Sequence, residues 1–390
     1  MREKLLPPEY IRTLQPYVPG KPIEETQREY GLKRVVKLAS NENPLGPSPR
    51  AIQAARKALR EQHRYPDAGA YELRMALSRY LSTRDRAISP QELLLGNGSN
   101  ELIDLLIRTY SVPGDQIATS KAAFVAYRVC AQAHGVDVVE SPLTPDLRFD
   151  LSALALLVRQ NARVRLVFIA NPNNPTGTHN TEAELREFLR EIQSIQDREV
   201  LCVLDYAYWE YVTKRGGNGV PDPMALQAEF RNVVVLRTFS KVYGLAGFRL
   251  GYAVGDAALF SYCERIRMPF NLSAPAMAAA QAALQDRAFV RRSVRENQRG
   301  MRYWQAELES LGIPFWPSQG NFLLVNVAQG LAMKGVEVFQ ECLKKGVIFR
   351  PVANYGLHDA LRISIGTMAE NRFAVRALRA LVRERKKPIT

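Results

Sequence analysis

Two hydroxyls, a lysine and an arginine follow closely on the apolar run 233–236. Thr238 and Ser240 precede Lys241, and Arg249 follows the lysine by eight residues, with small residues between them. A lone lysine is usually a solvated surface charge. Beside these hydroxyls and this arginine, however, the amine could lie next to a bound phosphate. Such an arrangement suits pyridoxal phosphate, whose aldehyde condenses with a lysine while its phosphate is held separately.

Two other polar segments also follow apolar runs. Residues 171–177 read Asn-Pro-Asn-Asn-Pro-Thr-Gly after the run that ends at Ala170, and the prolines and glycine predict a rigid, non-helical turn. Taken alone, a simple turn is the plainer interpretation. Asp205 ends the next run, and its carboxylate needs a cationic or hydrogen-bonding partner because an unpaired buried charge is costly. A helix N-cap or a buried ion pair would meet that need equally well.

Alternating apolar runs and helical patterns must position these residues from about residue 92 onward. Amphipathic stretches at 101–110 and 182–195 separate some of the runs. The runs typical of buried strands are 93–95, 116–120, 136–139, 164–170, 200–205 and 233–236. This alternation predicts an α/β fold with a mostly parallel sheet and helices on both faces. In such folds ligands bind at the carboxyl ends of the strands, where the polar segments lie.

The pattern changes after about residue 269. Short strands are predicted at 322–327, 347–350 and 361–365, and helices at 274–284, 294–311 and 370–384. These elements predict a smaller α+β C-terminal domain. We therefore expect an N-terminal arm at 1–37, a large domain at 38–270 and a small domain at 271–390.

Composition excludes several classes of protein. The chain has 390 residues, of which 46% are hydrophobic and 24% charged, so it is not disordered or collagen-like. Its four cysteines are widely separated and predict neither disulfides nor a metal site. The net charge of +14 is compatible with nucleic acid, a membrane surface or small anionic substrates. Because no apolar run has the length of a signal peptide or a membrane span, we expect a cytoplasmic protein.

The order of the motifs resembles the fold-type I pyridoxal-phosphate aminotransferases: Asn-Pro-x-Asn-Pro-Thr-Gly, then Asp-x-Ala-Tyr, then Thr-x-Ser-Lys with its arginine. Segments 40–49 (SNENPLGPSP), 64–67 (RYPD), 350–351 (RP) and 361–363 (LRI) more narrowly resemble histidinol-phosphate aminotransferases. The resemblance extends from about residue 10 to 380. It implies a mostly parallel seven-stranded sheet and pyridoxal 5'-phosphate as cofactor.

The resemblance also implies roles at the cofactor ring. Lys241 would form the Schiff base with the cofactor and later move the substrate proton. Asp205 would pair with the protonated ring nitrogen, which keeps the ring an electron sink. Asn174 and Tyr208 would hydrogen-bond the phenolic oxygen. Phe124 falls where the family places a stacking aromatic residue, usually tyrosine, although a core phenylalanine is the alternative.

Further positions match the phosphate and substrate contacts of the family. The cofactor phosphate would take helix N-terminal amides and side chains from this chain, with a tyrosine from a neighbouring subunit, which makes a homodimer a requirement. These residues are Gly98, Ser99, Asn100, Thr238, Ser240, Arg249 and, across the dimer, Tyr65. Arg362 matches a clamp for the amino donor's carboxylate. Tyr17, Asn43 and Arg350 are expected at the substrate, the tyrosine and the arginine at its phosphate.

The implied activity is a transamination between histidinol phosphate and 2-oxoglutarate. Anionic substrates then account for part of the positive charge without nucleic acid. Departures from the family pattern at 121–123, Asn100 and Tyr206 leave the substrate open. Similar enzymes transaminate phenylalanine or tyrosine, and others decarboxylate threonine phosphate, so these remain the alternatives.

Overall fold

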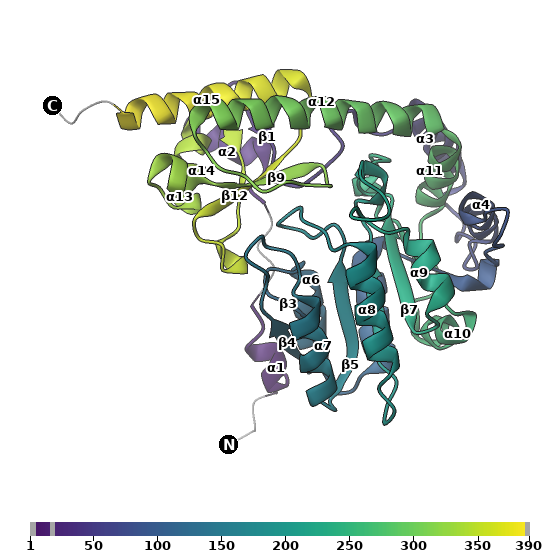
Figure 1. The fold of residues 1–390 in the computed structure, drawn as a ribbon. Helices are drawn as coiled ribbons and strands as arrows, with labels where there is room; N and C mark the ends of the chain where they lie inside the picture. The colour runs from purple at the N-terminus through teal and green to yellow at the C-terminus, as the bar shows by residue number, and fades with distance from the viewer. Residues whose placement is uncertain (1–4, 16–19, 387–390) are drawn as a thin grey trace.

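The computed structural model describes residues 5–15 and 20–386 of the chain, and a seven-stranded sheet forms its centre (Figure 1). In spatial order the strands are β2 (Leu93–Gly96), β8 (Gly251–Val254), β7 (Val233–Thr238), β6 (Leu201–Asp205), β5 (Val164–Ala170), β3 (Gln116–Ser120) and β4 (Asp137–Ser141). β8 is antiparallel to both of its neighbours, and the remaining pairs are parallel. The predicted α/β fold with a mostly parallel sheet is confirmed. The pattern of apolar runs identified every strand of this sheet except β8.

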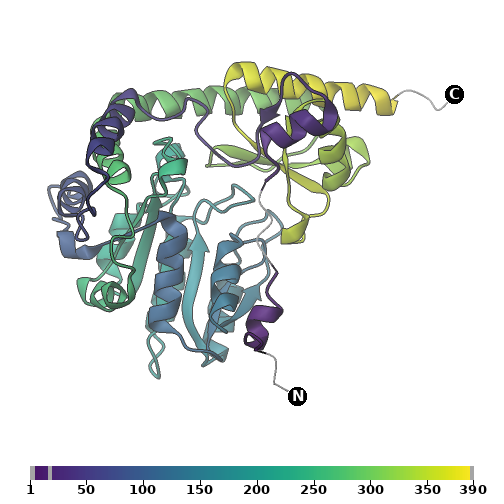
Figure 2. The same ribbon diagram turned by 180° about the vertical axis from the view of Figure 1, so that it is seen from behind.

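Helices cover both faces of the sheet. α7 (Leu151–Gln160) and α8 (Glu182–Gln193) lie in front of it in Figure 1, and α5 (Gly98–Tyr110) lies in front in the reverse view of Figure 2. Every residue of β6 and β7 is buried as a result. Both strands are rich in Val and Leu, as expected of parallel strands that are packed on two sides. Polar side chains at the ends of these strands are therefore held in fixed positions.

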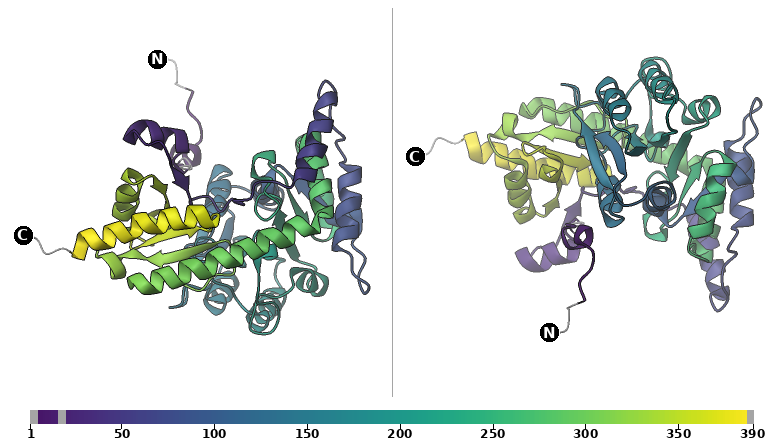
Figure 3. Two further views of the ribbon diagram at one scale, coloured as in Figure 1. Left: turned by 90° about the horizontal axis from the view of Figure 1, so that it is seen from above. Right: turned by 90° about the horizontal axis from the view of Figure 1, so that it is seen from below.

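A second, smaller α+β unit follows in sequence. Its antiparallel sheet consists of β11 (Arg350–Pro351), β12 (Ala360–Ser364) and β9 (Phe322–Asn326). The long helices α12 (Arg287–Leu311) and α15 (Met368–Lys386) lie side by side over this unit (Figure 3). Apolar side chains of both helices and of β9 and β12 form its core, with Trp304 fully buried at the centre.

The N-terminal segment joins the smaller unit. β1 (Val36–Lys37) pairs in parallel with β10 (Val347–Ile348), so the predicted strand 347–350 is two short strands. Ile23 and Val35 pack beside Leu343 of α14 (Gly335–Lys344). α11 (Ala274–Gln285) packs against α3 (Pro49–Ala58) and α4 (Tyr71–Leu81). The division of the chain at 37/38 and 270/271 stays a prediction.

The remaining elements are short. The α-helices are α1 (Glu9–Arg12), α2 (Ile23–Tyr30), α6 (Ala126–Ala133), α9 (Pro223–Glu229), α10 (Ala257–Ile266) and α13 (Val327–Leu331). Single turns of 3₁₀ helix are η1 (Leu59–Glu61), η2 (Pro90–Glu92), η3 (Trp209–Tyr211), η4 (Ala246–Phe248) and η5 (Ala353–Tyr355). Within the described residues, no helix has the length and apolarity to cross a membrane, and no three His, Cys, Asp or Glu side chains gather as a metal site. All four cysteines are free.

A buried ion pair fixes the strand that leads to Lys241. Arg237 of β7 donates to Glu210 of η3 at 2.6 Å, and the two residues are only 3% and 9% exposed. The guanidinium lies 6.0 Å from the ring centres of both Trp209 and Tyr252. A charge in such a place depends on its partner, because water cannot solvate it.

Removal of one partner of this pair should destabilise the protein strongly. We expect Glu210→Leu to lower the free energy of unfolding by about 3 to 5 kcal/mol, since Arg237 would stay buried without its counter-charge. The double variant Glu210→Leu/Arg237→Met should recover most of that loss. Urea unfolding followed by circular dichroism measures both. A single variant within about 0.5 kcal/mol of the wild type would contradict a structural role for the pair.

Candidate active site

A cleft of about 280 Å³ opens at the carboxyl ends of β5, β6 and β7, where the central sheet faces the smaller unit. Most of the residues selected from the sequence line it. They are Ser99, Asn100, Phe124, Asn174, Asp205, Tyr208, Thr238, Ser240, Lys241, Arg249, Arg350 and Arg362. Residues far apart in the chain thus meet in one place.

Three selected residues do not line the cleft, and a fourth lies outside the described part of the chain. Gly98 is buried behind the cleft against Arg249, and Tyr65 is 82% exposed at the surface. Asn43 is not among the described residues that line the cleft. Its amide donates to the carbonyl of Val242 at 2.7 Å and to Ser293 at 2.9 Å. Tyr17 lies outside the described residues.

Lys241 follows the carboxyl end of β7, and its amine points into the cleft. Nζ donates to the carbonyl oxygen of Ser40 at 3.3 Å and lies 5.6 Å from the ring centre of Tyr208. Burial, and after it the charge of Arg362, lower the pKa of Lys241 to about 8, although Glu42 and Asp205 act in the opposite direction. A lysine with such a pKa is partly neutral near physiological pH, as a nucleophile or base requires.

Asp205 ends β6 and presents a buried carboxylate to the same cleft. Oδ2 accepts a hydrogen bond from the hydroxyl of Tyr127 at 2.8 Å, and Oδ1 accepts one from the backbone N–H of Ala207 at 3.0 Å. Burial raises the pKa of Asp205, while these two bonds and the charge of Lys241 oppose that rise. Tyr127 is itself fully buried on α6 and stacks on Phe168 at 4.8 Å. The carboxylate is therefore oriented by rigid neighbours.

An anion cradle forms at the N-terminus of α5. Asn97 at the N-cap makes no side-chain hydrogen bond to the first turn, which leaves amides at Ser99 and Asn100 beside the cleft. A Cβ at Gly98 would lie 2.6 Å from Nη2 of Arg249, so only glycine lets the guanidinium approach the helix end. Free amides, the helix dipole and a guanidinium together favour a phosphate.

Arg362 and Arg350 form a second cationic region across the cleft. They are directly opposite in the register of β11 and β12, so both side chains lie on one face of the sheet. Arg362 donates to Oδ1 of Asn174 at 2.5 Å and to the carbonyl of Ala39, and its guanidinium lies 5.5 Å from the ring centre of Phe322. Together the two arginines give this side of the cleft a positive charge.

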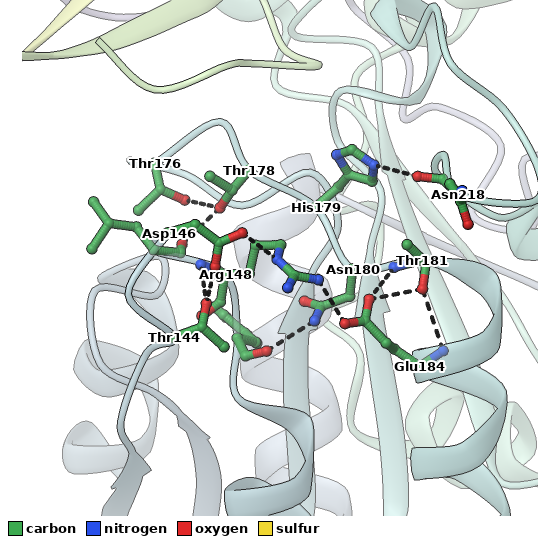
Figure 4. A network of polar contacts seen from close by, with 12 residues as sticks. Thr144, Asp146, Arg148, Thr176, Thr178, His179, Asn180, Thr181, Glu184 and Asn218 are labelled. Carbon is green, nitrogen blue, oxygen red and sulfur yellow. Dashed lines mark hydrogen bonds and ion pairs between the residues drawn. The ribbon is translucent and has the colours of Figure 1, made fainter. Parts of the chain in front are cut away.

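The turn that carries Asn174 is held by a polar network (Figure 4). The hydroxyl of Thr178 donates to the carbonyl of Leu147 at 2.7 Å, so it accepts the bond from the hydroxyl of Thr176, also at 2.7 Å. Arg148 bridges Asp146 and Glu184, each at 2.6 Å, which ties the hairpin beneath the turn to the start of α8. The side chain that contacts Arg362 is thus fixed from below.

Tyr208 follows Asp205 by three residues and lies buried beneath the lysine. Its hydroxyl accepts a hydrogen bond from Nδ2 of Asn41 at 2.9 Å, and its ring meets Phe322 edge-on at 5.2 Å. Burial raises the pKa of Tyr208 to about 12, against the charge of Arg362. The phenol therefore keeps its proton at neutral pH.

The similarity of this chain to known proteins shows the family to which it belongs. The chain matches the model described as "Aminotransferase class I and II" over residues 33–378. A histidinol-phosphate aminotransferase of Anaeromyxobacter sp. is 47% identical, with 96% of this chain and 98% of the relative covered. One of Bdellovibrio bacteriovorus is 44% identical, with 96% and 97% covered. The chain belongs to the class I and II aminotransferases.

Solved structures support the assignment of this chain to the aminotransferase family. The histidinol-phosphate aminotransferase of Sinorhizobium meliloti, in complex with pyridoxal-5'-phosphate, has a TM-score of 0.85 at 28% identity, with 96% of this chain and 97% of that chain covered. Aspartate aminotransferase of Thermus thermophilus has a TM-score of 0.82 at 20% identity, with 98% and 100% covered, and therefore shares the fold. The expected fold-type I architecture is confirmed.

Residues that the sequence did not single out also line the cleft of this aminotransferase or contact the side chains that line it. Tyr127 and Asn41 contact Asp205 and Tyr208, and Tyr355 lines the cleft directly. Asn41 lies inside the segment 40–49 that carried the resemblance, so that motif was an available signal for it. Tyr127 had none, because a tyrosine on an amphipathic helix is usually a core residue.

The depressed pKa of Lys241 is directly measurable in the aminotransferase. Acetic anhydride reacts only with a neutral amine, so labelling of Lys241 in the cofactor-free protein should reach half of its maximum rate near pH 8. Arg362→Gln removes a neighbouring positive charge, and the midpoint should therefore move to higher pH. Mass spectrometry of the labelled peptide gives the rate.

Arg165→Gln is the matched control, because this arginine pairs with Asp115 at the surface, outside the cleft. It should leave the midpoint unchanged. A wild-type midpoint close to the ordinary lysine pKa of about 10.4 would contradict the burial of the amine.

Proposed function

We propose that this aminotransferase transfers an amino group reversibly between L-histidinol phosphate and 2-oxoglutarate, giving imidazole acetol phosphate and L-glutamate. The reaction belongs to histidine biosynthesis, and we place the enzyme in the cytoplasm. The observation that carries the substrate assignment is the pair Arg350 and Arg362, which face one cleft from adjacent strands. Two cationic groups suit a carboxylate in one half-reaction and a phosphate in the other. The curated relatives with this name cover nearly the whole chain.

The cleft fits pyridoxal 5'-phosphate at three points. The buried carboxylate of Asp205 matches the protonated ring nitrogen. Burial disfavours the charged form of Asp205 and so raises its pKa, and a cationic partner would offset that cost. The free N-terminus of α5 and Arg249 match the phosphate. The partly neutral amine of Lys241 matches the aldehyde.

When bound, the cofactor supplies an electrophilic carbon for amines and a ring that accepts the electron pair left when a substrate proton departs. Lys241 Nζ takes that proton and returns it, which its depressed pKa permits near neutral pH. Asp205 would hold the proton on the ring nitrogen. Phe124 would cover a ring face, and Asn174 and Tyr208 would bind the phenolic oxygen.

The remaining residues hold anionic groups. Ser99, Asn100, Thr238, Ser240 and Arg249 bind the cofactor phosphate, with Gly98 allowing the close approach. Arg362 binds the α-carboxylate of glutamate as a planar fork. Arg350 binds the phosphate of histidinol phosphate, and we assign Tyr17 and Asn43 to the same substrate.

A second copy of the chain completes the site in this proposal. Tyr65 is exposed, stacks on Phe270 at 4.7 Å and lines a surface groove together with Arg249. Other large apolar side chains close in sequence to Tyr65 or to Phe270 are also exposed, namely Leu59, Tyr71 and Met268, as is Phe270 itself. Exposed apolar area of this kind favours burial against a partner. We therefore propose a homodimer in which Tyr65 reaches the phosphate of the neighbouring subunit.

A paired assay tests the substrate. With 2-oxoglutarate as acceptor, histidinol phosphate should give a far higher kcat/KM than phenylalanine. Arg350→Ala should lower kcat/KM for histidinol phosphate by about tenfold or more, because a charge-assisted contact to phosphate is lost. The same variant should affect phenylalanine much less, since that substrate carries no phosphate.

Arg215→Ala serves as the control, because Arg215 is exposed and packs over Trp209 at 4.4 Å, outside the cleft lining. It should change neither value. Equal losses with both substrates in Arg350→Ala, or a preference for phenylalanine in the wild type, would instead assign an aromatic aminotransferase.

A further inference from the structure

Asn41 and Ser364 form a short buried chain of hydrogen bonds that ends at Tyr208. The hydroxyl of Ser364 lies 2.7 Å from Oδ1 of Asn41, and Nδ2 of Asn41 lies 2.9 Å from the hydroxyl of Tyr208. All three side chains are at least nine-tenths buried. Ser364 lies on β12, two residues after Arg362, whereas Tyr208 follows the central strand β6. The chain therefore links the two sides of the cleft.

The direction of every bond in this chain is determined by one backbone group. The N–H of Asn41 can only donate, and it donates to Oγ of Ser364 at 2.8 Å. The hydroxyl hydrogen of Ser364 is then left to donate to Oδ1 of Asn41, which turns Nδ2 toward Tyr208. The reverse amide orientation would leave that hydroxyl hydrogen without an acceptor among the bonds that the described residues make to Ser364, which is costly in a buried place.

Asn41 is itself held rigidly. Its φ of 55° lies in the left-handed region, which asparagine tolerates better than most residues with a side chain. Asn321 donates to its carbonyl oxygen at 3.0 Å. Only an amide offers a donor and an acceptor at the required positions, whereas an aspartate at the same place would offer acceptors alone.

The consequence falls on the phenol of Tyr208. Its oxygen accepts from Asn41, so its own hydrogen is available for the cleft, which Tyr208 lines. The raised pKa of Tyr208 keeps that hydrogen in place at neutral pH. Tyr208 thus presents a fixed donor to the cleft. Nζ of Lys241 lies 5.6 Å from the centre of the Tyr208 ring.

We propose that Asn41 and Ser364 are positioning residues that make Tyr208 an obligatory hydrogen-bond donor toward an anionic oxygen in the cleft. This inference rests on the proposed function, in which that oxygen is the phenolic oxygen of pyridoxal phosphate. A donated bond draws negative charge from this oxygen. The oxygen then stabilises a proton on the neighbouring Nζ of Lys241 less well. The hydrogen bonds of Ser364 and Asn41 therefore lower the proton affinity of that nitrogen.

Reversal of the bond at Tyr208 tests this role. In Asn41→Asp the carboxylate accepts the phenol hydrogen, and the phenolic oxygen of the cofactor loses its donor. The pH midpoint of the visible absorption band of the pyridoxal-phosphate-loaded protein should rise by about one unit or more, a tenfold change in proton affinity. This titration is read without turnover.

The background Tyr208→Phe separates hydrogen bonding from the added charge. Asn41→Asp in that background contributes only its charge, so its rise should be smaller than in the wild type by about one unit. Glu42, Asp205 and Arg362, which act on the same nitrogen, are unchanged in all variants. Equal rises in the two backgrounds would overturn the inference while the visible band still supports the cofactor.

Ser364 provides an independent check. Ser364→Ala removes the bond that orients the amide of Asn41 and should raise the pH midpoint of the visible band. Ser364→Thr keeps the hydroxyl and should have the wild-type midpoint. A midpoint in Ser364→Ala equal to that of the wild type would overturn the role of Ser364. A wild-type protein that develops no visible band with pyridoxal phosphate would overturn the proposed function, and this inference with it.

Discussion

The exclusion of water from charged groups is the constraint on which the site depends. Asp205 and Arg362 are 5% and 7% exposed, and the amine of Lys241 lies between neighbours that lower its pKa to about 8. In water these groups would be ordinary ions with weak mutual influence. In the cleft each one needs a partner, and the charged parts of a cofactor and a substrate provide partners. Burial thus favours a ligand that has both a cationic ring and anionic groups.

The fold meets this constraint by bringing strand ends together. β6 ends at Asp205 and β7 leads into Lys241, so neighbouring parallel strands bring a carboxylate and an amine to the same cleft. β12 approaches from the smaller unit with Arg362 and Ser364. Contacts such as Arg362 to Asn174 and Ser364 to Asn41 then connect the two units through the site itself. A displacement of the smaller unit would therefore be felt directly at the reacting groups.

The sequence was informative where a residue's type is unusual for its place. A lysine, hydroxyls and an arginine after a buried strand contradict a simple core or surface interpretation, and the structure brings those residues to one cleft. The short strand β8, Gly-Tyr-Ala-Val, has no alternating pattern and follows only the single 3₁₀ turn η4 rather than an α-helix, so periodicity did not reveal it. α12 begins at Arg287 rather than at 294, because its first turns are arginine-rich and are held by the Asp286 cap. Tyr127 shows the main limit, since its partner Asp205 is distant in sequence and only the packing of α6 on the sheet joins them.

The site of covalent attachment provides the most direct test of the account. The protein loaded with pyridoxal phosphate would be reduced with borohydride, digested and mapped by mass spectrometry. We predict that the pyridoxyl mass is found on the peptide that contains Lys241, because this amine is partly buried in the cleft that Asp205 also lines and has a lowered pKa. Modification of a different lysine with Lys241 untouched would contradict the account.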